Sequence, residues 1–197
     1  MSKSLKIIYF IACALLLASC NKESHIVLPK IISDGMIIQQ NSQMTFWGKA
    51  LPGSRITIRT DWDISVTATA SIDSMWEAQF PTIAADNKKH QISLTTSDTA
   101  IVINDILLGE VWLASGQTNM IMPLEGIAGS PVDGSKEAIA YANDDELRFF
   151  IVDEKISWNK EFNSSGSWQK TTPNTARKFS ATAYFYAQML RDSLKVP

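Results

Sequence analysis

Residues 107–120 read LLGEVWLASGQTNM, and the pattern of the whole chain changes across this stretch. Glu110–Ala114 is a short apolar run that predicts a strand, and Ser115–Met120 is a polar turn. A strand that leads into a turn can hold a nucleophile, because the strand fixes the turn and the following amides can face a developing oxyanion. The nucleophile position holds Thr118, a secondary alcohol. Since Met120 replaces the second Gly of a G-x-S-x-G elbow, the turn by itself indicates a polar loop more strongly than an active site.

The sequence before this stretch is typical of an all-β domain, which we place at residues 28–108. Short runs of alternating apolar and polar residues are separated by turn signals such as LPGS at 51–54, where Pro presets φ and Gly tolerates a positive φ. This pattern predicts a β-sandwich or jelly-roll-like domain with Trp47 and Trp76 in its core. The expected strands are Met44–Gly48, Ile56–Arg59, Ser65–Thr69, Trp76–Phe80, His90–Thr95 and Ala100–Ile106.

The sequence from residue 109 to 197 has the pattern of an α/β domain. Besides Glu110–Ala114, the run Leu147–Val152 predicts a strand, and the period becomes helical from Ser180, the expected N-cap, to Leu194. The expected apolar face of that helix consists of Ala183, Phe185, Tyr186, Met189, Leu190 and Leu194. Strands that alternate with helices predict the first part of a doubly wound parallel sheet. Such sheets usually have four or more strands, so with two we expect this domain to be truncated.

The N-terminus predicts export and lipid attachment. Lys3 and Lys6 precede a nearly continuous apolar run from Ile7 to Ala18, which is typical of a secretory signal and too short for a transmembrane helix. Small residues directly before Cys20 match a bacterial lipoprotein box. We therefore expect a signal peptide at residues 1–19, a lipidated tether at 20–27, and a protein anchored to a bacterial membrane through Cys20, either in the periplasm or on the cell surface.

Composition narrows the function classes. Hydrophobic residues make up 45% of the 197 residues and charged residues 19%, which is a globular composition. The formal charge is −2 and no Lys/Arg run is present, so nucleic acid is not an expected partner. The two cysteines, at positions 13 and 20, fall in the signal and at the lipidation site, so no disulfide is expected in the mature chain.

Six stretches together resemble the N-terminal portion of the sialate O-acetylesterase family, of the SGNH/GDSL hydrolase superfamily. They are LPKIISDGMIIQQ (28–40), MTFWGKALPGSRITI (44–58), SMWEAQFP (74–81), LLGEVWLASGQTNMIMPL (107–124), LRFFIV (147–152) and KFSATAYFYAQMLRDSLKVP (178–197). The resemblance implies a β-sandwich-like domain followed by the hydrolase domain. It also implies removal of O-acetyl groups from sialic acid or related sugars, with no metal or other cofactor.

The family motif can be compared with the turn at each position. Gly116, Gln117, Asn119 and Met120 match it, whereas Thr118 stands where the family has its nucleophilic Ser. The resemblance implies that the Thr118 amide is one oxyanion donor. The extra methyl group of Thr crowds a position shaped for Ser and restricts χ1.

The family's Asp and His lie beyond the last residue of this sequence. Neither His25, in the tether, nor His90, expected at the surface or an edge of the β-domain, matches the family's base. A hydroxyl needs such a base near neutral pH, so the chain alone is expected to be incomplete as an esterase.

Three alternatives remain from the sequence. The chain is part of a lipid-anchored acetylesterase, or a non-catalytic lipoprotein that binds a glycan or a protein partner, or an enzyme in which Thr118 is the nucleophile and a separate chain supplies the rest. Ser115 is a further candidate nucleophile, although it precedes the Gly and its Oγ is expected to point elsewhere.

Overall fold

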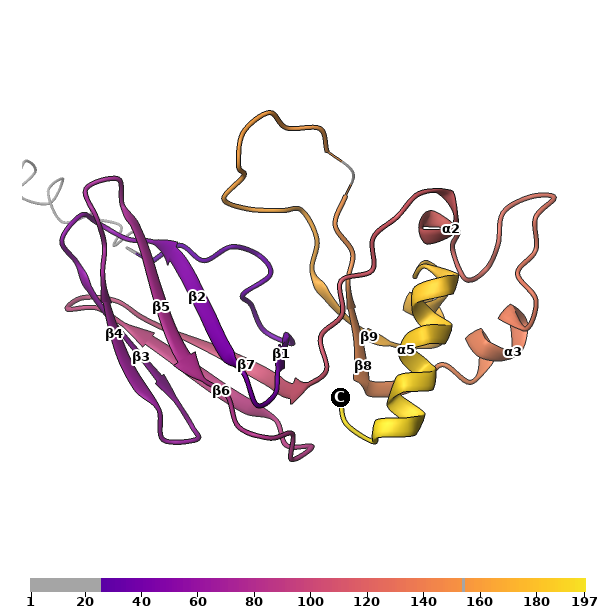
Figure 1. Cartoon of the computed structure of the whole chain (residues 1–197), viewed down its shortest axis with the longest axis horizontal. Coiled ribbons are helices and arrows are strands. Elements are labelled where there is room, and N and C mark those ends of the chain that lie inside the picture. Colours follow the sequence, from indigo (N-terminus) through magenta and orange to yellow (C-terminus); the bar gives the residue numbers. More distant parts are fainter. Residues whose placement is uncertain (1–25, 154) are drawn as a thin grey trace, which may run out of the picture.

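The computed structural model describes residues 26–153 and 155–197, which form two parts that lie end to end (Figure 1). The β-domain covers residues 26–109, and the C-terminal part covers residues 110–197. The strands are β1 (Ile37–Gln39), β2 (Gln43–Lys49), β3 (Arg55–Thr60), β4 (Ser65–Thr69), β5 (Met75–Pro81), β6 (His90–Thr95), β7 (Ala100–Gly109), β8 (Asp144–Phe150) and β9 (Trp168–Thr171). The helices are α2 (Thr118–Ile121), α3 (Ser135–Ala140), α4 (Pro173–Ala176) and α5 (Ala181–Leu194).

Two sheets enclose the core of the β-domain. The larger has the order β1-β7-β6-β3-β4, and the smaller pairs β2 with β5. All pairs are antiparallel except β1 with β7. In β5 every second residue is buried, because one face of the strand meets the core and the other meets solvent. Trp76 is buried there, and Gly48 opposite it leaves room for the indole, since a Cβ would come within 2.6 Å of the ring.

The six strands predicted for this domain are confirmed to within three residues at each end. The sequence reasoning missed β1, because three residues are too few for alternation and the parallel partner β7 lies about seventy residues further along the chain. The tether expected at residues 20–27 overlaps the fold. Ile26 is buried, and the Val27 amide donates to the Lys49 carbonyl.

The C-terminal part has a small core of its own. The strands β8 and β9 pair antiparallel, and α5 packs beside them (Figure 1). The helix predicted from Ser180 is confirmed, with the Ser180 hydroxyl accepting a hydrogen bond from the Ala183 amide. The residues of this core are Leu124, Ala142, Ala176, Phe179, Ala181 and Tyr184. Within the described ranges β8 and β9 form no parallel pair, so the doubly wound sheet stays a prediction.

Two expectations for this part are wrong. Glu110–Ala114 is not a strand, and no strand among the described residues pairs with it, so its amides have no ladder in which to bond. Trp112, in the middle of the predicted strand, is exposed together with its neighbours Val111 and Leu113.

The buried face of α5 is also different from the expected one. Ala181, Ala183 and Tyr184 are buried, whereas Phe185 and Met189 are exposed. The face that is buried and the face that was expected to be buried both carry apolar residues at a helical spacing, so the spacing alone does not distinguish them. The described structure covers the helix most completely on the side that carries Ala181, Ala183 and Tyr184.

A buried arginine joins the two parts. The Arg148 side chain is 0% exposed, and its guanidinium donates to the carbonyls of Gly35 and Asp105 at 2.7 and 2.6 Å. It also contacts the Asp105 carboxylate at 3.0 Å, and Lys170 lies 2.9 Å from the other carboxylate oxygen. Burial alone would raise the pKa of Asp105, but the hydrogen bonds from Lys170 and Arg148 outweigh it and hold the pKa below its ordinary value.

Candidate active site

The segment that carries the nucleophile motif is fastened where it leaves β7. Glu110 accepts hydrogen bonds from Gln39 at 3.2 Å and Gln40 at 3.0 Å, and the Val111 amide donates to the Gln39 side chain at 2.8 Å. The adjacent glutamines of IIQQ therefore fix the direction in which the chain leaves the β-domain. Side-chain clamps take the place of the strand ladder that the sequence predicts here.

The motif itself forms a short turn and the one-turn helix α2. Thr118 is the first residue of α2, and its side chain is exposed. Gly116 approaches the Met120 side chain closely, since a Cβ on Gly116 would come within 2.8 Å of it. A side chain at position 116 would therefore displace Met120 and the turn around Thr118.

The start of α5 supports this turn from below. The Thr182 hydroxyl donates to the Asn119 carbonyl at 3.2 Å, and the Ala181 amide donates to the Met122 carbonyl at 2.9 Å. The Ser180 hydroxyl lies 4.0 Å from the Met120 sulfur. The C-terminal helix, sixty residues further along the chain, thus positions α2 directly.

The arrangement suits attack by an exposed hydroxyl at a helix start. Amides in the first turn of a helix have no intrahelical acceptor, so the Thr118 amide is available to an oxyanion. Ser115 is exposed before the turn, with no contact to Thr118 recorded in the described part of the chain. The oxyanion role of the Thr118 amide and the nucleophilic role of its hydroxyl remain predictions.

No imidazole is available to Thr118 within residues 26–153 and 155–197. His90 is the one histidine there, and its two ring nitrogens lie 2.7 Å from Asp61 and 2.9 Å from Asp86. The expectation that His90 is a surface or edge residue is wrong, because it is 9% exposed and begins the interior strand β6. His25 and the lipidation candidate Cys20 lie outside the described residues.

Electrostatics support a structural role for His90. Burial alone would lower the pKa of His90, but hydrogen bonds to Asp86 and Asp61 outweigh it and raise the pKa above its ordinary value. Burial likewise favours a higher pKa for Asp86, and the His90 hydrogen bond overcomes it and lowers that pKa. A histidine whose protonated form is stabilised by two carboxylates, and whose two ring nitrogens both face them, is not placed to act as a general base for Thr118.

The described residues contain no cluster of three or more His, Cys, Asp or Glu side chains that could hold a metal ion. In the same residues, no helix has both the length and the apolar character needed to cross a membrane.

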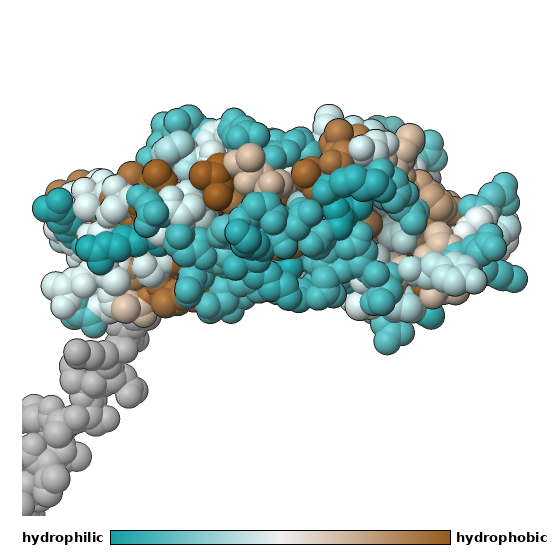
Figure 2. All heavy atoms as spheres, turned by 90° about the horizontal axis from the view of Figure 1, so that it is seen from below, coloured by the Kyte–Doolittle hydropathy of each residue, from teal (hydrophilic) through white to brown (hydrophobic). Residues whose placement is uncertain are grey.

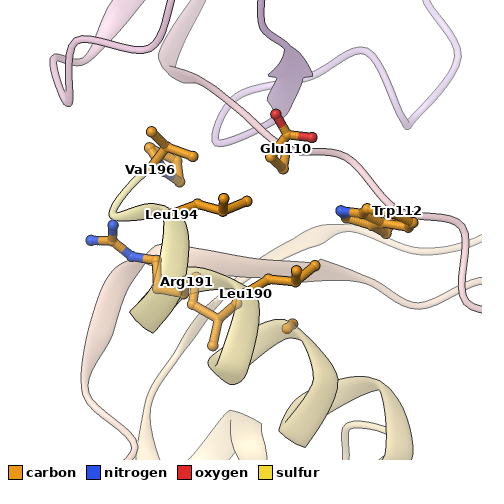
Figure 3. Close-up of a pocket in the computed structure, with 9 residues that line it drawn as sticks. Glu110, Trp112, Leu190, Arg191, Leu194 and Val196 are labelled. Carbon is orange, nitrogen blue, oxygen red and sulfur yellow. The ribbon is translucent and has the colours of Figure 1, made fainter.

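A small pocket of about 40 Å³ lies between the motif segment and α5 (Figure 3). Glu110 and Trp112 border it on one side, and Leu190, Leu194 and Val196 border it on the other, as Figure 3 shows. The pocket is too small for a sugar ring. It shows instead that residues 110–112 pack over α5, and Trp112 also meets Tyr186 of this helix edge to face, with 5.4 Å between the ring centres.

An apolar surface remains beside the motif. Leu113 is 93% exposed, and Val111, Ile121, Phe185 and Met189 are exposed as well. Seen from below in Figure 2, hydrophobic residues gather along one edge of the α5 end of the molecule, whereas the middle of that face is hydrophilic. Residues 110–114, whose sequence predicted a buried strand, therefore contribute to the surface of the described structure.

Comparison with known proteins points to one class of enzyme. A carbohydrate acetylesterase from Xanthomonas citri superposes with a TM-score of 0.80 at 32% identity, over 87% of this chain and 38% of that structure. A mouse protein named sialate O-acetylesterase is 25% identical over 185 residues, and a rat protein of the same name is 30% identical over 115 residues. No model of a protein family matches the chain.

Each comparison covers a larger share of this chain than of the related protein. The mouse alignment includes 84% of this chain but 33% of the mouse protein, and the rat alignment includes 54% of this chain but 20% of the rat protein. The chain thus spans about a third or less of the curated relatives it matches.

Proposed function

We propose that this chain, which is related in sequence and fold to an acetylesterase family that includes the sialate O-acetylesterases, provides the β-domain and the nucleophile segment of a carbohydrate O-acetylesterase. The substrates are O-acetylated sialic acid or other O-acetylated glycans. The observation that carries the proposal is the likeness to the Xanthomonas citri acetylesterase over most of this chain, combined with Thr118 exposed at the start of α2.

In this proposal the Thr118 hydroxyl attacks the acetyl carbonyl carbon. A base takes the hydroxyl proton, the Thr118 amide donates to the oxyanion, and the sugar alcohol leaves with a proton. Water then hydrolyses the acetyl-enzyme and releases acetate. The described residues supply the nucleophile and one oxyanion donor but no free imidazole, so we expect the chain alone to hydrolyse O-acetyl esters at close to the uncatalysed rate.

A chimera tests the proposal. Residues 26–197 replace the structurally matching part of the Xanthomonas citri acetylesterase, and hydrolysis of 4-nitrophenyl acetate and of an O-acetylated sugar is measured. We expect the Thr118→Ser chimera to be active and the chimera with the unchanged Thr118 to be slower, because β-branching restricts χ1. The Thr118→Ala chimera should lose about 10³-fold or more relative to the Thr118→Ser chimera.

The matched control is Ser115→Ala added to the Thr118→Ser chimera, which should keep its activity. A folded Thr118→Ser chimera that is no faster than the Thr118→Ala chimera would show that residues 115–121 do not hold a nucleophile.

A second candidate is a non-catalytic lipoprotein that binds a glycan or a protein partner. Two observations favour it, namely Thr in the place of Ser at position 118 and the commitment of His90 to Asp61 and Asp86. It predicts that the full chain binds acetylated glycans and that the chimera with the unchanged Thr118 hydrolyses them no faster than the Thr118→Ala chimera. Turnover by the full chain that disappears in Thr118→Ala would exclude this candidate.

We also propose that Cys20 carries the lipid that anchors the protein to a bacterial membrane, a proposal supported by the lipoprotein box alone. Each buried methylene of an acyl chain contributes about 0.8 kcal/mol to membrane binding. The processed chain should therefore partition into the detergent-rich phase in a detergent phase separation, and the Cys20→Ala chain should not. Equal partitioning of the two chains would contradict the anchor.

A further inference from the structure

The loop between β8 and β9 presents an unusual apolar tip. Trp158 is 97% exposed and its neighbour Ile156 is 91% exposed. No ring contact or hydrogen bond of Trp158 is recorded in the described part of the chain, although the side chain is among the largest in the protein. Exposed aromatic residues of this kind are typical of binding surfaces, because packing against a ligand removes their apolar area from water.

The loop is held by the β-domain on the side that follows the tip. The Lys30 amide donates to the Asn163 side chain at 2.8 Å, and the Lys49 ammonium lies 4.7 Å from the centre of the Phe162 ring. Beyond it, the Trp168 indole donates to the Ile31 carbonyl at 2.8 Å. Two contacts of the loop and one contact of the first residue of β9 therefore join this segment to the β-domain.

The tip itself is a braced turn. The Ser157 hydroxyl lies 2.8 Å from both the Asn159 carbonyl and the Glu161 carboxylate, and Lys155 pairs with Glu161 at 2.9 Å. This turn holds the chain on both sides of Trp158, whose side chain is exposed.

The charge of the loop argues against a membrane as its target. Residues 153–161 contain three acids and two lysines, which gives a formal charge of −1. Anionic lipid surfaces attract segments with clustered positive charge, which this loop lacks.

The loop lies on the same side of the molecule as the nucleophile motif. Leu147 of β8 and Trp112 of the motif segment border one pocket, so the two chain segments are neighbours. Both then run toward the upper side of Figure 1, where β8 continues into the loop and residues 115–117 continue into α2.

We propose that Trp158 is a stacking platform for a sugar ring of the acetylated glycan. The inference rests on the proposed function. The apolar C–H face of a pyranose packs against the exposed indole, while the sugar hydroxyl groups remain in water. Trp158 would thus select for carbohydrate esters over small acetate esters, which have no ring to stack.

Binding by the full chain tests this inference. The ¹⁵N-labelled chain is titrated with the methyl glycoside of an O-acetylated N-acetylneuraminic acid, and the six tryptophan indole N–H signals are followed by NMR. Trp158→Phe assigns the Trp158 signal. We expect that signal to shift on titration, and the signal of the buried Trp76 to stay unchanged.

Affinities of variants complete the experiment. Trp158→Ala should weaken binding about tenfold, the order of effect expected from burying one face of an indole, and Trp158→Tyr should retain most of it. The matched control is Tyr141→Ala, which removes another exposed aromatic ring (82% exposed) at the C-cap of α3 and should leave the affinity unchanged.

The outcomes separate the two proposals. If the chain binds the acetylated sialoside and Trp158→Ala binds it equally well, the platform is overturned and the proposed function stands. If the chain binds neither this sialoside nor any of a panel of O-acetylated glycans, both are overturned. If Trp158 instead mediates binding to phosphatidylcholine–phosphatidylglycerol vesicles without affecting sugar binding, the loop is a membrane contact and the platform is wrong.

Discussion

At the scale of single residues, the sequence could predict the GQTNM turn better than the surroundings of His90. GQTNM is contiguous, so a turn at this position could be predicted from a few neighbouring residues, whereas the one-turn helix that begins at Thr118 was not predicted. The state of His90 could not be predicted, because its partners Asp61 and Asp86 are placed by the fold. Thr118 is exposed, so its extra methyl group is not crowded by neighbouring atoms as expected. The restriction of χ1 is then the remaining effect of the methyl group.

The His90 ion-pair cluster makes stability depend on pH. The folded pKa of His90 lies above the ordinary value of 6.5, so its contribution is complete below about pH 6.5 and is lost as pH rises through the folded pKa. His90→Gln should therefore lower the free energy of unfolding more at pH 5.5 than at pH 9, as measured by urea denaturation.

Gln91→Ala is the matched control, because the neighbouring residue is exposed and does not titrate. Its effect should be the same at both pH values. A His90→Gln penalty that grows between pH 5.5 and pH 9 would contradict the assigned protonation.

At the scale of elements, the alternation of apolar and polar residues predicted the strands whose one face is buried in the core of the β-domain. The strands β3 and β5 alternate as expected because the opposing sheet covers one face. The run 110–114 has the composition of a strand, but a strand needs a partner, and the described residues provide none. The orientation of α5 was wrong for a related reason. The helix carries two apolar stripes, and its contacts with the rest of the fold determine which of them is buried.

The N-cap of α5 allows a direct test at this scale. Ser180→Ala removes the hydroxyl that accepts from the Ala183 amide, and should lower the free energy of unfolding by about 1 kcal/mol. The control Ser193→Ala, at the exposed end of the same helix, should change it by less than about 0.5 kcal/mol. Equal effects of the two changes in thermal or urea unfolding would contradict the cap. Because α5 supports α2, we expect Ser180→Ala also to increase hydrogen exchange at residues 119–122.

At the scale of the whole molecule, the joint between the two parts was beyond the reach of sequence. Arg148 stands out as the single charged residue in an apolar run, which signals a buried partner without identifying it. The partner, Asp105, lies 43 residues earlier and has a positive φ of 56°. A contact of this kind depends on how the β-domain and the C-terminal part meet, and the sequence pattern of either part alone does not contain that information.

The joint should be energetically important. Arg148→Met removes the donor to the Gly35 and Asp105 carbonyls and leaves the Asp105 carboxylate with Lys170 as its remaining close cation, and should lower the free energy of unfolding by about 3 kcal/mol. Lys155→Met breaks an exposed ion pair and should cost at most about 1 kcal/mol. A small effect of Arg148→Met in urea denaturation would show that the two parts fold independently of this contact.

The central claim is that residues 115–121 hold a nucleophile at position 118, and covalent capture tests it most directly. The Thr118→Ser and Thr118→Ala chimeras with the Xanthomonas citri acetylesterase are treated with a fluorophosphonate, and the adduct is located by mass spectrometry. The account predicts one adduct in the first chimera, on the serine introduced at position 118, and none in the second. An adduct on Ser115, or no adduct on a folded Thr118→Ser chimera, would contradict it.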